Sequence, residues 1–121
     1  MKKLLAIASI FEAITGLLLI IVPAIVVKFL IGGDIEGAGL IASRVAGCAL
    51  IALSIACWPS NKNMQAFWGM LVYSTLAGLY LALLGVGGVW VGKLLWPAAA
   101  THILLSILLV FAWFKNRNAA K

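Results

Sequence analysis

Four long apolar runs constrain this chain more than any other feature of its sequence. They lie at 4–27, 38–58, 64–84 and 97–114. A run of ~20 apolar residues crosses the ~30 Å hydrocarbon layer of a bilayer as a helix. Turn-forming residues separate the runs: Gly32-Gly33-Asp34 with Gly37, then 59–63, then Gly85-Val86-Gly87-Gly88. The sequence therefore predicts an all-α integral membrane four-helix bundle, with residues 1–121 as a single transmembrane domain.

The composition excludes two other classes of protein. The chain is 65% hydrophobic and 10% charged over 121 residues, and a soluble domain of this size would expose large apolar patches. The net charge of +6 is compatible with nucleic-acid binding, but the Lys and Arg residues stand at the edges of the apolar runs, where they face lipid head groups. We expect the lipid bilayer as a partner, and no nucleic acid.

The positions of the basic residues predict the orientation of the bundle. Short loops rich in Lys and Arg stay in the cytoplasm. One side would carry Lys2, Lys3, Lys62, Lys115, Arg117 and Lys121, and the other Lys28 and Lys93 with Asp34 and Glu36. Both termini are therefore predicted to be cytoplasmic.

The connection before the fourth run, Gly85 to Trp96, is rich in glycine and also carries aromatic residues. Trp90 and Trp96 flank Lys93 within it, and such residues favour the membrane interface. The segment is predicted to lie in the outer interface as a lid. The alternative is that the third helix is simply longer and tilted.

Three ionisable residues, Glu12, Arg44 and His102, lie inside the apolar runs. An ionisable side chain at such depth is costly and is by default a candidate functional residue. From the helical rise, Glu12 and Arg44 differ by ~9 Å along the membrane normal, a gap that two extended side chains span directly or through one water. A Glu12–Arg44 pair is therefore predicted.

Tyr73 and Tyr80 lie at depths similar to those of the ionisable residues, and each polar residue shares its helix face with small residues. This pattern predicts a cavity bordered by His102 and Tyr80, opening outward beneath the Trp90–Trp96 segment, with Arg44 at its floor. The alternatives are a structural ion pair, a His102 that only donates to a neighbour such as Ser106, and tyrosines that only pack.

The chain lacks the residues that most metal and catalytic sites require. One His and three acids, two of them in a loop, do not make a closed zinc or di-iron site, and a haem would need an axial ligand from another copy. No phosphate-binding loop and no Ser-His-Asp set occurs. No metal and no cofactor is expected.

Several short patterns carry a resemblance to a known family. They are Glu12 with Thr15-Gly16 in the first run, Pro23, then 44–47 (RVAG) in the second, and 94–98 (LLWPA) leading to His102 in the fourth. Together they resemble small uncharacterised bacterial four-helix proteins of the DoxX-like kind. The resemblance covers most of the chain and implies a multi-pass protein of the bacterial inner membrane, without an agreed activity.

A second resemblance is to the small multidrug resistance exporters. They have a similar length and number of spans, and they also carry a glutamate in the first helix. Only Glu12 and its neighbourhood carry it. It implies proton-coupled export through Glu12. An arginine paired with that carboxylate would compete with the proton that such a role requires.

Three functions follow as alternatives. The first is a non-enzymatic membrane protein whose Glu12, Arg44 and His102 cluster binds a small amphipathic or anionic ligand or stabilises a partner subunit. The second is a proton-coupled transporter, and the third is an enzyme acting on a lipid or quinone. Small residues at four-residue steps, as in Gly39, Ser43 and Gly47, allow close helix packing within one chain, in a homo-oligomer or in a larger complex.

Overall fold

The computed structural model describes residues 1–60 and 64–120, and this part of the chain contains helices as its only regular elements. They are α1 (Lys2–Ile21), α2 (Pro23–Ile31), α3 (Ala38–Ala56), α4 (Met64–Gly87) and α5 (Leu95–Ala119). Four of them, all except α2, are long and apolar enough to cross a membrane. The all-α prediction is confirmed, and the long helices correspond to the predicted runs.

The first predicted run, 4–27, is wrong as a single helix. α1 ends at Ile21, Val22 leaves helical geometry at φ −130° and ψ 55°, and Pro23 opens α2. Proline has no N–H to continue the helical hydrogen bonds, and its ring disfavours helical geometry at the preceding residue. α2 then ends at Gly32, whose φ of 74° is one that glycine adopts without strain.

The connection between α4 and α5 is shorter than predicted. α4 continues to Gly87, three residues beyond the predicted end at 84, and α5 begins at Leu95. The third helix is therefore longer than predicted by these three residues, and 88–94 is the non-helical part of the connection. α5 also extends past the predicted end at 114 to Ala119. Of the predicted turn 59–63, residues 61–63 lie outside the described residues, as do the basic residues Lys62 and Lys121.

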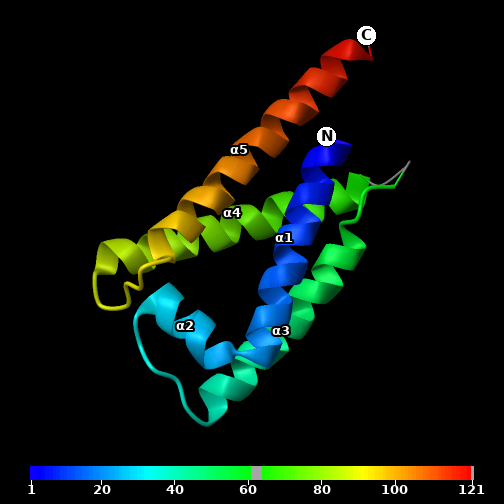
Figure 1. The fold of residues 1–121 in the computed structure, drawn as a ribbon. Coiled ribbons are helices and arrows are strands. Elements are labelled where there is room, and N and C mark those ends of the chain that lie inside the picture. Colours follow the sequence, from blue (N-terminus) through cyan, green and yellow to red (C-terminus); the bar gives the residue numbers. More distant parts are fainter. Residues whose placement is uncertain (61–63, 121) are drawn as a thin grey trace.

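The long helices form two pairs, α1 with α3 and α4 with α5 (Figure 1). Both termini lie at the same end of the molecule, here called the termini end; α2 and the segment 88–94 lie at the other, here called the α2 end (Figure 1). The pairs meet near the termini end in a cluster of buried side chains: Leu5, Ala8, Cys57, Ala66, Phe67, Met70 and Leu109. A group on the packed face of α1 just beyond this cluster therefore lies near α4 and α5.

Glycines explain the close packing of the first pair. A Cβ atom on Gly16 would lie 2.7 Å from the carbonyl oxygen of Gly47, and one on Gly47 would lie 2.5 Å from that of Gly16. Both distances are shorter than van der Waals contact, so only glycine allows α1 and α3 to approach this closely. Gly47 belongs to the small-residue pattern identified in the sequence.

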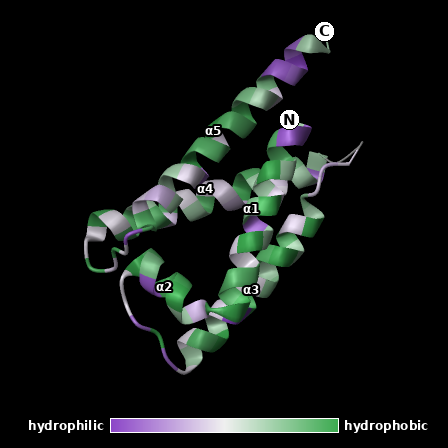
Figure 2. Cartoon of the chain, in the orientation of Figure 1, coloured by the Kyte–Doolittle hydropathy of each residue, from purple (hydrophilic) through white to green (hydrophobic). Residues whose placement is uncertain are grey.

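Hydrophobic residues predominate along the long helices, and hydrophilic residues concentrate at the helix ends and loops (Figure 2). Many of the large apolar side chains are exposed. Ile7, Ile41, Leu83 and Phe111 are each at least 66% exposed. This distribution suits a lipid environment and makes the buried polar residues the exceptional ones.

Candidate functional site

Glu12 is buried because it lies on the packed face of α1. That face repeats at three- and four-residue steps and comprises Leu5, Ala8, Ser9, Glu12 and Gly16. Only 1% of the Glu12 surface is exposed. The helix therefore places a carboxyl group between the two helix pairs, one turn beyond the apolar cluster.

Tyr73 of α4 and His102 of α5 face this carboxyl group. The Tyr73 hydroxyl donates a hydrogen bond to Oε2 of Glu12 at 3.1 Å. Nδ1 of His102 lies 3.9 Å from the other oxygen, Oε1. The tyrosine and histidine rings pack edge to face, with centroids 5.6 Å apart and planes at 84°. Three helices thus each contribute one polar residue to a single cluster, here called the Glu12 cluster.

The backbone around His102 is held in place by small residues and hydroxyls. Gly78 lets α4 approach α5 closely, since a Cβ there would lie 3.3 Å from Cβ of His102 and 2.9 Å from Cγ1 of Ile103. Ser106 donates to the backbone carbonyl of His102 at 3.0 Å, and Thr75 donates to Ser106 at 3.2 Å. The imidazole itself is not the acceptor or donor in either bond.

Two atoms of the Glu12 cluster have no hydrogen-bond partner in the described part of the chain. They are Oε1 of Glu12 and Nδ1 of His102, and both are buried. The 3.9 Å between them is too long for a hydrogen bond. Buried polar atoms are normally satisfied, so an unsatisfied pair this close together points to a group that the protein does not itself supply.

A groove between α1 and α5 has Glu12 and His102 in its lining. This groove has a volume of about 190 Å³. The wider groove described below has a volume of about 390 Å³. The lining of the groove between α1 and α5 is Leu4, Ile7, Ala8, Phe11, Glu12, Thr101, His102, Leu104, Leu105 and Leu108. Apart from Thr101, the polar lining residues are Glu12 and His102, so the groove combines an apolar channel with a polar end. A site with this lining fits a ligand that has an apolar tail and a polar head.

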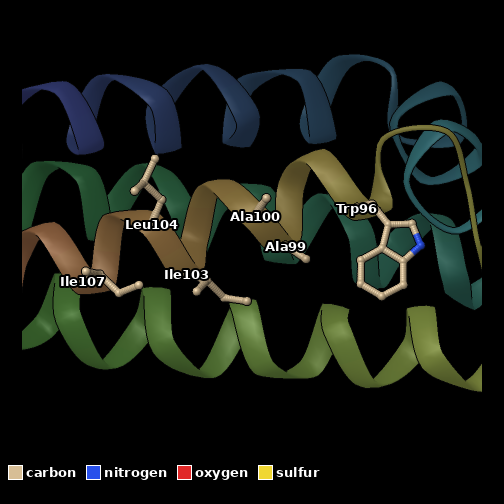
Figure 3. A pocket seen from close by; sticks show the side chains of 6 residues that line it. All are labelled: Trp96, Ala99, Ala100, Ile103, Leu104 and Ile107. Carbon is tan, nitrogen blue, oxygen red and sulfur yellow. The ribbon is translucent and has the colours of Figure 1, made fainter.

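The wider groove runs along α5 and has a different character (Figure 3). It is lined by Trp96, Ala99, Ala100, Ile103, Leu104 and Ile107. The indole nitrogen of Trp96 is the only polar side-chain atom among these residues. This surface can contact acyl chains, but it offers nothing comparable to the Glu12 cluster for holding a polar head.

The predicted Glu12–Arg44 pair is wrong. Arg44 is exposed, and its Nε donates to the carbonyl of Ile20 at 3.2 Å, near the end of α1. Helical side chains lean toward the N-terminus of their own helix. Because α1 and α3 run in opposite directions, Glu12 leans toward the termini end and Arg44 toward the α2 end.

The predicted cavity between His102 and Tyr80, with Arg44 at its floor, is also wrong. Tyr80 is 64% exposed, and the groove that reaches His102 is lined by neither Tyr80 nor Arg44. α1 meets α4 through Phe67 and Met70, near the start of α4, so α1 does not cover Tyr80, which lies further along α4. The correct partner of Glu12 is the earlier tyrosine, Tyr73.

The predicted lid residues lie at the α2 end, where the segment 88–94 packs against α2. Gly92 and Leu94 donate backbone hydrogen bonds to the carbonyls of Leu30 and Phe29. The Trp90 ring lies over Gly33, where a Cβ would be 2.6 Å from the ring. Lys93 is exposed, and Trp96 belongs to α5, where its ring packs against Gly85. The segment 88–94 therefore packs against α2 and Trp96 against α4, and none of these residues lines the groove that contains His102.

Sequence reasoning missed the groove between α1 and α5. A usable signal was present, because aliphatic and aromatic residues flank Glu12 on α1 (Leu4, Ile7, Phe11) and His102 on α5 (Leu104, Leu105, Leu108) at helical spacing. Which helices face each other cannot be read from that spacing alone.

The described residues contain no group of three or more His, Cys, Asp or Glu side chains placed to hold a metal ion. Glu12 and His102 would supply two ligands, fewer than the three of catalytic zinc sites. Comparison with protein-family models, curated proteins and solved structures finds no match to this chain. The resemblance to DoxX-like proteins thus stays a prediction.

Proposed function

We propose that this protein is a non-enzymatic membrane protein that binds a small amphipathic molecule in the groove between α1 and α5. The observation that carries the proposal is the pair of unpartnered buried atoms, Oε1 of Glu12 and Nδ1 of His102, at the polar end of an apolar groove. A ligand head would bond to these atoms while its tail lies among the aliphatic side chains.

The head group is one that donates a hydrogen bond. The free atom of Glu12 is a carboxyl oxygen, and Arg44, the cation that would have favoured an anionic ligand, lies at the end of α1 instead. A second carboxylate would be repelled by Glu12 in this buried setting. An amine or alcohol head on a single alkyl chain meets these requirements.

Binding of matched amphiphiles tests the proposal. Dodecylamine, dodecanol and dodecanoate share a chain and differ in the head, so native mass spectrometry of the protein with each compound separates head recognition from chain partitioning. We expect the amine and the alcohol to bind more tightly than the carboxylate, and Glu12→Gln to remove the preference for the amine.

The matched control is Glu36→Gln, since Glu36 is an exposed acid outside the groove. Equal binding of all three compounds, or an unchanged preference in Glu12→Gln, would contradict recognition by Glu12.

A second candidate function is proton-coupled transport through Glu12. It is favoured by the position of Glu12, which lies between the two helix pairs and has no arginine to compete for its proton. Proteoliposomes with an internal pH dye test it. A proton flux that depends on an added alkyl amine, is lost in Glu12→Gln and persists in Arg44→Gln would support transport over binding alone.

We further place the termini end in the cytoplasm and the protein in a bacterial inner membrane. The excess of Lys and Arg near the termini supports this orientation, and the resemblance to DoxX-like proteins supports the choice of membrane.

A further inference from the structure

Arg44 is a charged residue within the long apolar helix α3 and lies outside the Glu12 cluster; its Nε contacts the carbonyl of Ile20, near the end of α1. Eighteen residues of helix separate Lys2 from Ile20, which corresponds to ~27 Å of helical rise. With Lys2 at one edge of a ~30 Å hydrocarbon layer, the carbonyl of Ile20 lies close to the other edge.

The side chain of Arg44 reaches this level from a deeper backbone position. Arg44 stands twelve residues before the end of α3 at Ala56, or ~18 Å from that end by helical rise. Its side chain leans toward the start of α3 and meets Ile20 at the 3.2 Å hydrogen bond. Long basic side chains in membrane helices extend to the interface in this manner.

Most of the hydrogen-bonding capacity of this guanidinium is unused. Arginine has five N–H donors, and the bond from Nε to Ile20 uses one of them. Within residues 1–60 and 64–120, no carboxylate lies within 4.0 Å of Arg44, and Asp34 of the α2 end is paired with Lys28 at 3.0 Å. The two Nη groups thus form an exposed fork at the depth where lipid phosphates begin.

We propose that Arg44 binds the phosphate of a phospholipid in the leaflet at the α2 end. A guanidinium fork matches two phosphate oxygens, which a single ammonium group does not. The bond to Ile20 holds the fork in place. The Ile20 carbonyl is available because Pro23 ends α1, which leaves carbonyl groups in the last turn of α1 without helical partners. This site is separate from the Glu12 groove and does not depend on the function proposed for it.

Lipid titration of delipidated protein in detergent, followed by native mass spectrometry, tests the site. The probes are dioleoyl phosphatidylglycerol and dioleoylglycerol, which share their chains and differ in the phosphate. We expect the phospholipid to bind at least about tenfold more weakly to Arg44→Gln, the loss expected for charge-assisted hydrogen bonds. Binding of dioleoylglycerol should not change.

Two further variants separate the fork from charge and from folding. Arg44→Lys keeps the charge but loses the fork, so it should bind the phospholipid more weakly than the wild type, and this comparison holds even if Arg44→Gln unfolds. Lys93→Gln removes an exposed cation at the same end and should bind the phospholipid like the wild type.

Three results would overturn the proposal. Equal phospholipid affinity in the wild type and Arg44→Lys would show that the fork is not used. Displacement of the lipid by inorganic phosphate at equal concentration would assign the site to a free anion. A dimer that forms without lipid and is lost in Arg44→Gln would assign Arg44 to a contact between copies.

Discussion

At the residue scale, the account depends on which side chains meet Glu12. The similar heights of Glu12 and Tyr73 were predictable from the sequence, because helical rise converts residue number into height. The neighbours were not predictable, since Tyr73 and Tyr80 share a face of α4 and only one of them lies where α1 crosses it. The predicted position of the Arg44 side chain was wrong, because a depth calculated from helical rise ignores the direction in which helical side chains lean.

Replacing Tyr73 by phenylalanine tests the bond to Glu12. The change removes the hydroxyl that donates to Oε2 at 3.1 Å and leaves a buried carboxyl oxygen without that donor. We expect a loss of about 1 to 2 kcal/mol in the free energy of unfolding, measured by denaturant titration in detergent. Tyr80→Phe is the matched control and should change stability by less than ~0.5 kcal/mol, because Tyr80 is exposed. Equal losses in the two variants would contradict the bond.

A double-mutant cycle tests the choice of partner. Because Glu12 and His102 lie 3.9 Å apart and Arg44 contacts Ile20 instead, the effects of Glu12→Gln and His102→Phe on unfolding should be non-additive by at least ~0.5 kcal/mol. Those of Glu12→Gln and Arg44→Gln should add. Additive effects for Glu12 and His102, with non-additive effects for Glu12 and Arg44, would instead support a pairing of Glu12 with Arg44.

At the element scale, the sequence predicted the four long helices because runs of apolar residues determine both their type and their length. It did not separate α2 from α1, since the apolar run continues through Pro23 and only the backbone chemistry of proline interrupts the helix. The small residues of α3 were predicted to pack, and Gly47 does so against Gly16.

Adding a methyl group at Gly16 tests the close approach of α1 and α3. The Cβ of Gly16→Ala would lie 2.7 Å from the carbonyl oxygen of Gly47, so the helices must separate. We expect a destabilisation of about 1 to 3 kcal/mol by thermal or denaturant unfolding in detergent. Gly69→Ala is the control, since its nearest contact is Sγ of Cys57 at an ordinary 3.4 Å. A neutral Gly16→Ala would show that the two helices are not in contact there.

At the scale of the whole molecule, two helix pairs meet at the Glu12 cluster, with both termini at one end (Figure 1). The sequence predicted both termini at one end, because an even number of long antiparallel helices returns the chain to the end where it began. It did not indicate the pairing of the helices, which depends on contacts far apart along the chain.

Labelling of single introduced cysteines in intact cells tests the proposed orientation, in a background with Cys48 and Cys57 replaced. Asp34→Cys lies at the α2 end and should react with an impermeant maleimide from outside, whereas Asn118→Cys lies at the termini end and should react only after lysis. Labelling of Asn118→Cys from outside would reverse the orientation.

Photolabelling tests the central claim, that an amphiphile binds in the groove between α1 and α5, most directly. A dodecylamine with a diazirine on its chain would be bound to the protein in nanodiscs, irradiated and mapped by peptide mass spectrometry. We predict labels concentrated on groove-lining residues such as Phe11, Leu105 and Leu108, displaced by unlabelled dodecylamine and lost in Glu12→Gln. Labels spread evenly over outward-facing residues such as Ile41 and Leu83, and unchanged in Glu12→Gln, would contradict the claim.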